Sequence, residues 1–277
     1  MLLNLIYFLC FVVSGTAMIR SGLALFPCVL LGAGVWIGSF LVFVLLAALF
    51  LWICCAAVDY DRPQTGDSAF YRKLAGVYIE ALIQLFRVRI DTTGLEKLPK
   101  EGRFLLVCNH QSEADPGVLL HYFKNSQLAF ISKQENRDLP FVGKIMHKIL
   151  CQLIDRDNDR QALRGILNCI NIIKEDKASI AVFPEGGIKI YGKLSPFRPG
   201  VFKIATKTNV PIVVCTLLGT QDVLPNIPKL RPTQVQLHLV DVISPQTYAG
   251  MKTTELSEMV HDMMLRDLGP DYIPDFE

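Results

Sequence analysis

The first 58 residues form a nearly continuous apolar segment in which Arg20 is the only charged side chain. Leu2–Met18 is almost entirely apolar, and a second apolar run follows from Leu23 to Val58. A helix needs about 20 apolar residues to cross the hydrocarbon core of a bilayer. The pattern therefore predicts a membrane anchor at residues 1–58, made of two helices that form a transmembrane hairpin.

The position of the turn in this hairpin is suggested by helix breakers. Pro27, Gly32, Gly34 and Gly38 cluster in the middle of the apolar segment. We expect one span near residues 3–22, a turn or re-entrant piece around Pro27–Gly38, and a second span near 37–58. One long, bent first span is an alternative. A cleaved signal peptide is disfavoured, because the chain has no basic region before the apolar run and the run is too long.

Two spans would place both ends of the anchor on one side of the membrane. The basic residues that follow it, Arg62, Arg72 and Lys73, favour the cytoplasmic side. The sequence thus predicts a multi-pass membrane protein whose remaining residues form a cytoplasmic domain. The eight cysteines form no C-x-x-C pair, and we interpret them as reduced, buried thiols.

Beyond the anchor, short apolar runs alternate with segments of helical periodicity. Strands are expected at Arg103–Cys108, Gln127–Ser132, Ser179–Phe183, Val210–Leu217 and Val235–Val240, and helices at Pro116–Lys124, Asp159–Lys174 and Thr253–Leu265. This alternation predicts an α/β fold with a central β-sheet flanked by helices, over residues 94–277. Residues 59–93 would be a linker with an amphipathic helix at Ser68–Val88, which lies on the membrane surface or packs on the domain.

The charged residues change this picture little. All 26 acids and 27 of the 28 bases lie in residues 59–277, so this part of the chain has a net charge of only +1. A nearly balanced charge argues against a strongly basic nucleic-acid binder, and we expect no nucleic-acid partner. The 51% hydrophobic content excludes a disordered chain.

One polar loop joins a predicted strand to a predicted helix. It contains Asn109, His110 and Asp115, at the carboxyl end of a strand, where α/β proteins hold ligands. His110 and Asp115 can meet if His110 lies in the loop and Asp115 begins the helix. A histidine held by a carboxylate is a suitable general base for a hydroxyl group. The alternative is that Asp115, followed by Pro116, only caps the helix.

Two further stretches suggest an anionic ligand. A strand runs into Phe183-Pro184-Glu185-Gly186-Gly187, and from Gly186 to Lys207 the chain has no acid but five bases: Lys189, Lys193, Arg198, Lys203 and Lys207. Glycines allow close approach of the backbone to a ligand, although these bases could equally form a solvated face. Arg156, in Ile154-Asp155-Arg156-Asp157, could clamp a phosphate or pair with its neighbouring aspartates.

These stretches, in this order, resemble the glycerolipid acyltransferase family, which includes the 1-acylglycerol-3-phosphate acyltransferases. The N-H-x4-D signature is matched by Asn109, His110 and Asp115, and the F-P-E-G signature by Phe183–Gly186. Leu153–Arg156 matches the arginine-containing block, Pro196–Gly200 matches a P-F-x-x-G element, and Val210–Ile212 matches a V-P-I strand. The resemblance covers roughly residues 94–218.

The resemblance implies a membrane-bound O-acyltransferase of phospholipid biosynthesis, with residues 94–277 as the acyltransferase domain. His110 and Asp115 would be catalytic, and the acceptor's phosphate would be bound by a larger group: Arg156, Glu185, Gly186, Gly187, Lys189, Lys193 and Arg198. The family implies no metal and no cofactor, with acyl-CoA or acyl carrier protein as co-substrate. The other partners would be the bilayer and a membrane lipid acceptor, 1-acylglycerol 3-phosphate, converted to phosphatidic acid.

The chain departs from the family after the F-P-E-G block, where Gly187-Ile188 replaces the usual Thr-Arg. This leaves glycerol 3-phosphate or another lysolipid as alternative acceptors. Two other classes remain open. A metal-dependent hydrolase would use His110, Glu113 and Asp115 as ligands, and a non-catalytic lipid-binding membrane scaffold would use the same fold.

Overall fold

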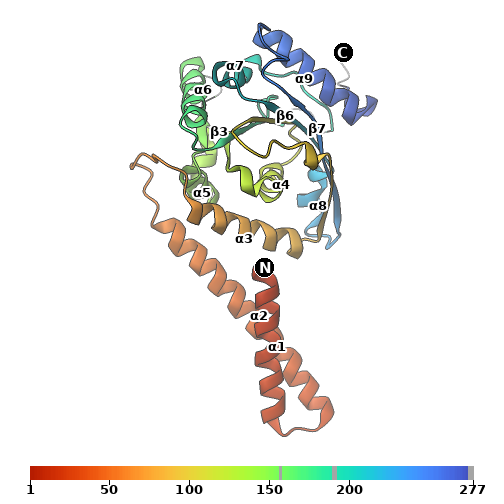
Figure 1. Ribbon diagram of the computed structural model, residues 1–277. Helices are drawn as coiled ribbons and strands as arrows, with labels where there is room; N and C mark the ends of the chain where they lie inside the picture. Colours follow the sequence, from red (N-terminus) through yellow and green to blue (C-terminus); the bar gives the residue numbers. More distant parts are fainter. Residues whose placement is uncertain (156–157, 189–191, 274–277) are drawn as a thin grey trace.

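The computed structural model describes residues 1–155, 158–188 and 192–273. It consists of a central seven-stranded β-sheet flanked by helices, from which a long, apolar helical hairpin projects (Figure 1). The predicted fold class is therefore confirmed.

The hairpin consists of α1 (Leu2–Ser21) and α2 (Leu25–Ala56), both long and apolar enough to cross a membrane. The turn expected around Pro27–Gly38 is wrong, because the chain reverses at Gly22, which has a φ of 61°. Pro27 lies in the first turn of α2, where proline is tolerated. Gly32 is a packing position, since a Cβ there would collide with the Met18 side chain of α1.

The sheet has the strand order β1-β7-β6-β2-β5-β3-β4. The strands are β1 (Val88–Thr93), β2 (Leu105–Cys108), β3 (Leu128–Lys133), β4 (Gln152–Ile154), β5 (Ser179–Val182), β6 (Ile212–Leu218) and β7 (Thr233–Ile243). Neighbouring strands are parallel except β6 and β7, which are antiparallel. The five predicted strands are confirmed, whereas β1 and β4 were not expected.

Helices cover both faces of the sheet and bury two apolar clusters. One cluster lies beneath α6 (Asp159–Lys174), α7 (Lys203–Thr208) and α9 (Thr253–Leu268). The other lies against α4 (Asp115–Tyr122), α5 (Val142–Lys148) and the start of α8 (Val223–Asn226). Short 3-10 helices occur at Leu95–Lys97, Lys124–Ser126, Gln134–Asp138, Pro199–Phe202, Thr220–Asp222 and Pro270–Tyr272.

The amphipathic segment forms α3 (Ala69–Leu85), which packs against α4 and α5 and also contacts α1. Its Arg72 donates hydrogen bonds to the Asp67 carboxylate (2.7 Å) and to the Leu128 carbonyl (2.8 Å), which fastens the helix to the domain. Figure 1 shows α3 between the sheet and the hairpin. Packing on the domain is thus confirmed, and the position of α3 beside α1 leaves its outer side facing the base of the hairpin.

Candidate active site

The site is formed where two adjacent parallel strands end. β2 and β5 are paired so that Val107 lies opposite Val182, which brings their carboxyl ends together. After β2 the chain passes through α4 to β3, which lies beyond β5 in the sheet. After β5 it passes through α7 to β6, which lies on the other side of β2. The carboxyl ends of adjacent parallel strands whose connections run in opposite directions are where α/β proteins commonly hold ligands. The loop after β2 carries His110, and the turn after β5 carries Glu185.

His110 and Asp115 are in direct contact, as the loop-and-helix arrangement required. The His110 Nδ1 lies 2.8 Å from Oδ2 of Asp115, whose side chain is fully buried. The His110 side chain itself is 16% exposed. Since the two ring nitrogens lie on opposite sides of the imidazole, Nε2 faces away from Asp115. The arrangement fixes the ring with one nitrogen bonded to the protein and the other available to a substrate hydroxyl.

Asp115 does not cap its own helix, so the capping interpretation is wrong. The N-cap position of α4 is Ala114, and no side chain caps the helix there. Instead, Oδ2 of Asp115 accepts hydrogen bonds from the backbone amides of Gln111 (2.7 Å) and Ser112 (2.9 Å). The carboxylate therefore turns back into the loop, where it holds both the loop backbone and the His110 ring.

Glu185 joins the two loops of the site. Its Oε1 accepts a hydrogen bond from the His110 backbone amide (2.7 Å), and its Oε2 accepts one from the Ser195 backbone amide (2.8 Å). The residue is only 2% exposed, and this burial raises the pKa of the Glu185 carboxyl, against the opposing effect of the two amides. Phe183, two residues earlier, stacks on the His110 ring at a centroid distance of 4.2 Å.

Asn109 has a positional role that its place in the motif did not explain. Its side-chain amide donates to the Leu217 carbonyl (2.9 Å), while its Oδ1 accepts from the Leu217 backbone amide (2.7 Å). These two bonds tie the end of β2 to β6, beyond the last backbone pair of the two strands. Asn109 thus fixes the origin of the loop that carries His110.

The turn after β5 brings Arg198 alongside the site. Gly186 has a φ of 76°, and a Cβ at this position would lie 2.7 Å from Nε of Arg198. The Arg198 backbone amide also donates to the Pro184 carbonyl (2.8 Å). A side chain at position 186 would be strained and would displace the guanidinium, so this arrangement requires glycine at position 186.

The other predicted phosphate-binding residues are less closely defined. Arg156 and Lys189 lie outside the described residues, whereas Gly187 continues the turn with a φ of 139° and Lys193 is half-buried. β4, which leads to Asp155, ends two strands beyond β5 at the same edge of the sheet.

Two other kinds of site, a metal centre and a thiol nucleophile, find little support within residues 1–155, 158–188 and 192–273. No group of three or more His, Cys, Asp or Glu side chains is placed to hold a metal ion.

A thiol nucleophile is also disfavoured at this site. All eight cysteines are free, and Cys108, next to Asn109, is completely buried. Burial raises the pKa of the Cys108 thiol well above its ordinary value. A buried, protonated thiol is unreactive, so Cys108 is unsuited to act as a nucleophile at this site.

Comparison with known proteins gives consistent matches. Residues 89–217 match the family described as Acyltransferase. The chain is 34% identical over 157 residues to the chloroplastic 1-acyl-sn-glycerol-3-phosphate acyltransferase BAT2 of Brassica napus, covering 56% of this chain and 44% of that protein. It is 29% identical over 210 residues to a 1-acyl-sn-glycerol-3-phosphate acyltransferase of Chlamydomonas reinhardtii, covering 73% and 61%. The chain thus spans about half the length of these curated relatives.

A solved structure extends the similarity to most of the chain. It is the crystal structure of the 1-acyl-sn-glycerophosphate acyltransferase PlsC from Thermotoga maritima, at 26% sequence identity and a TM-score of 0.58. The match covers 81% of this chain and 94% of the PlsC chain. This coverage is larger than the part of the chain after residue 68, which holds the sheet and its helices, so the match also includes at least some of the preceding residues.

Proposed function

We propose that this chain, which matches the Acyltransferase family over residues 89–217, moves a fatty acyl group from a thioester donor to the free hydroxyl of 1-acylglycerol 3-phosphate. The product would be phosphatidic acid. The observation that carries the proposal is the buried contact between His110 and Asp115 at the carboxyl edge of the sheet (2.8 Å). It lies in a chain whose relatives are named for this reaction.

In the proposed reaction, His110 acts as the general base. Its Nε2 takes the proton of the acceptor hydroxyl, and the oxygen attacks the carbonyl carbon of the thioester. The tetrahedral intermediate then collapses with cleavage of the carbon–sulfur bond, and the leaving thiolate receives the proton from His110. Asp115 holds the ring orientation and stabilises the imidazolium that forms between the two steps.

The negative charge of the intermediate requires hydrogen-bond donors. The Gly186 amide is used within the turn, since it donates to the Phe183 carbonyl (3.1 Å). We assign the oxyanion contact to the next amide, that of Gly187, which follows directly in the same turn. Backbone donors held in place in this way stabilise the transition state more than the ground state.

The acceptor's phosphate would be held by cations around the turn. Arg198 is the cation that the fold brings against Gly186, and Lys193, Lys189 and Arg156 are the further candidates. A guanidinium suits this task because it binds phosphate oxygens with two parallel hydrogen bonds. The support for Glu185 is of a different kind, because its carboxylate oxygens bond to the protein backbone, and we propose that it acts by fixing the His110 loop.

The hairpin would keep the enzyme at its lipid substrate. We propose residues 1–58 as the anchor, 59–93 as the linker with α3, and 94–277 as the acyltransferase domain on the cytoplasmic side. At 1.5 Å per residue, α1 is about 30 Å long, the thickness of a hydrocarbon core, and α2 is long enough to cross it at a tilt. The full chain should therefore resist extraction by alkaline carbonate.

An acceptor panel tests the function. The full chain is purified in detergent micelles and given labelled acyl-CoA or acyl carrier protein thioester. It is then offered 1-acylglycerol 3-phosphate, glycerol 3-phosphate or monoacylglycerol, and products are identified by lipid mass spectrometry. We expect phosphatidic acid to form far faster than diacylglycerol, because only the phosphorylated acceptors can use the cations. Equal rates with monoacylglycerol would refute phosphate recognition, and faster acylation of glycerol 3-phosphate would replace the proposed acceptor.

A further inference from the structure

One corner of the domain exposes large apolar side chains next to cations. Outside the hairpin, Leu230 is the most exposed large apolar side chain of the described residues, at 81%. Leu224 (51%), Leu82 (48%) and Leu85 (45%) are also exposed. A soluble surface scatters single apolar residues, whereas a group of them marks an interaction site.

These side chains come from segments that are tied together. Leu82 and Leu85 lie on the last turn of α3, and Arg87 follows directly. The Arg87 guanidinium donates to the Leu230 carbonyl (3.1 Å), and the Arg87 carbonyl accepts from the Thr233 amide (3.4 Å). The end of α3 and the loop between α8 and β7 therefore share one corner, which we call the Leu230 corner: Leu82, Leu85 and Leu230 with Arg87, Lys229 and Arg231.

The charged side chains nearest to Leu230 are cations. Lys229 and Arg231 flank Leu230 on either side, and Arg87 contacts it from the end of α3, all three being exposed. Neither residues 81–90 nor residues 223–235 contain an acid. An apolar tip surrounded by cations suits the boundary of an anionic bilayer, where the apolar side chain enters the acyl region and the cations meet lipid phosphates.

The loop presents Leu230 in a fixed position. The Leu230 amide donates to the Ile227 carbonyl (3.1 Å), and the Arg231 amide donates to the Asn226 carbonyl (3.1 Å). Leu230 also lies between two prolines, Pro228 and Pro232, which restrict the backbone. Leu230 has a φ of 52°, in the left-handed region that a branched side chain rarely adopts. A leucine at a strained and exposed position stabilises neither the turn nor the core, so its side chain is accessible to a partner outside the chain.

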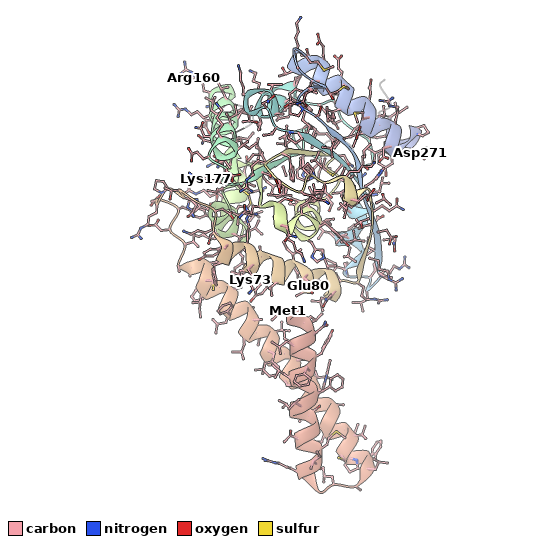
Figure 2. All side chains as sticks on the ribbon, in the orientation of Figure 1. Met1, Lys73, Glu80, Arg160, Lys177 and Asp271 are labelled. Atoms are coloured by element: carbon pink, nitrogen blue, oxygen red, sulfur yellow. The ribbon has the colours of Figure 1, made fainter. Side chains whose placement is uncertain are left out.

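The hairpin shows on which side that partner lies. The amino group of Met1, at the start of α1, forms an ion pair with Glu80 of α3 at 2.6 Å, two residues before Leu82 (Figure 2). The hairpin extends from this point away from the sheet (Figure 1). If the hairpin lies in a bilayer, the C-terminal end of α3 and the Leu230 corner meet the surface of the same bilayer.

We propose that the Leu230 corner is a second membrane contact, in which Leu230 inserts into the outer acyl region of an anionic bilayer. This inference rests on the membrane anchoring in the proposed function. A hairpin alone leaves the domain free to rotate about the base of the anchor. A second contact at the end of α3 would hold the domain in one orientation, so that the active site keeps a constant height above the lipid.

Depth-dependent fluorescence quenching tests the contact in the full chain. Trp36→Phe and Trp52→Phe remove both native tryptophans, and Leu230→Trp then introduces a single reporter. The protein is reconstituted into vesicles of phosphatidylglycerol and phosphatidylcholine, with the latter brominated on acyl carbons near the headgroup. Inserted apolar side chains reach roughly 5–10 Å below the surface, so we expect the Leu230→Trp emission to lose most of its intensity.

Met251→Trp in the same background is the matched control. Met251 is exposed and stands two residues before α9, which lies on the opposite side of the sheet from the hairpin (Figure 1). Its emission should be unaffected by bromine. Equal quenching of the two reporters, or none at Leu230→Trp in vesicle-bound protein, would overturn the proposal. A blue shift at Leu230→Trp without quenching would assign the corner to a second copy of the chain instead.

Charge reversal provides an independent readout. A cation near an anionic surface strengthens binding about five-fold, so Lys229→Glu with Arg231→Glu should sharply reduce the quenching of Leu230→Trp in phosphatidylglycerol vesicles. The double variant should lose much less in vesicles of phosphatidylcholine alone; an equal loss in both would contradict the electrostatic part of the proposal.

Acyl transfer is measured on the same samples to separate this proposal from the proposed function. Unquenched protein that still makes phosphatidic acid refutes only the Leu230 contact. Quenched protein with no acyl transfer refutes only the enzymatic function. The reporter positions lie outside the catalytic and phosphate-binding residues, so the Leu230→Trp and Met251→Trp proteins should keep the rate of their tryptophan-free background.

Discussion

The molecule contains two histidine–aspartate pairs with nearly the same geometry. His110 and Asp115 are 2.8 Å apart, and His238 of β7 and Asp267 of α9 are 2.6 Å apart. The surroundings differ. The first pair lies in the loop that follows a strand, and its carboxylate is fully buried. The second pair joins a strand to the helix that covers the sheet, and its histidine and aspartate side chains are 34% and 19% exposed.

The partners of each aspartate show what each pair does. Asp115 holds two loop amides as well as the histidine, so it organises a ligand-facing loop. Asp267 accepts a hydrogen bond from the Thr216 hydroxyl (2.5 Å), and Thr216 lies opposite His238 on β6. The second pair thus joins α9 to two strands. A short distance between histidine and aspartate therefore does not by itself mark a catalytic site, and our proposal for His110 rests also on its position at the sheet edge beside a glycine turn.

The largest effect expected is that of His110→Ala. Removal of a general base typically lowers the rate about 10²–10⁴-fold, and we expect a loss in this range for acyl transfer. The side chain lies in a loop at the sheet edge rather than in the apolar core, so the melting temperature of the detergent-solubilised protein should change little. Initial rates at saturating donor and acceptor measure the loss. Retention of more than a third of the wild-type rate would contradict the assignment of His110.

Asp115→Asn tests how the first pair works. The amide oxygen can still accept from the Gln111 and Ser112 amides, but it lacks the charge that stabilises the imidazolium. We expect kcat to fall toward the lower end of the roughly 10²–10⁴-fold range, with little change in either KM. The matched change Asp267→Asn should leave kcat unaltered. If both variants lose equally, the contrast between the pairs is wrong.

Arg198→Ala should have a smaller and more selective effect. Losing a charge-assisted contact costs about 1.5–3 kcal/mol, or roughly ten- to a hundred-fold in kcat/KM for the acceptor. The KM of the acyl donor should change much less. Lys203→Ala is the matched control, because Lys203 is an exposed cation of the same acid-free stretch in α7. An unaltered acceptor KM in Arg198→Ala would exclude Arg198 from phosphate binding.

Two variants of Glu185 test whether this residue supports the His110 loop or acts through its charge. Glu185→Ala leaves the buried amides of His110 and Ser195 without their acceptor, which costs about 1–3 kcal/mol for each unpaired group. Glu185→Gln keeps one acceptor. Burial raises the pKa of the Glu185 carboxyl, so its ionisation opposes folding, and a neutral amide loses no stabilising charge. The glutamine variant should therefore unfold at higher denaturant concentration than the alanine variant.

The activity of the glutamine variant then decides between two roles. If Glu185 only supports the His110 loop, Glu185→Gln should retain more acyl transfer than Glu185→Ala, in step with stability. A stable glutamine variant that is as inactive as Glu185→Ala would show that the charge acts on the substrate. Chemical unfolding and initial rates on the same preparations provide both measurements.

The sequence could predict the first pair because its members are close in the chain. His110 and Asp115 belong to one loop, whereas His238 and Asp267 come from separate elements, and nothing in their local pattern joins them. Glu185 was predicted as a site residue, but its two amide partners are set by the tertiary fold. The sequence thus predicts local chemistry and leaves contacts between elements undetermined.

The fold follows the same rule. α6 begins and ends where its amphipathic pattern predicted, and the five apolar strands were found. β4 has three residues, too few for a pattern, and β1 alternates polar and apolar residues directly after an amphipathic helix. The hairpin turn was misplaced because glycine and proline break helices less strictly where the surrounding residues are apolar and the proline lies in the first turn.

The smallest effect on activity is expected from His238→Ala, the counterpart of His110→Ala. Asp267 would keep its bond to Thr216 but lose the one to His238, which costs about 1.5–3 kcal/mol for a bond to a charged group. The loss should be near the lower value, because solvent partly screens a histidine that is one-third exposed. A lower melting temperature with an unchanged rate per folded molecule would establish the second pair as a structural tie. An inactive protein with an unchanged melting temperature would make both pairs catalytic, and position at the sheet edge would no longer distinguish them.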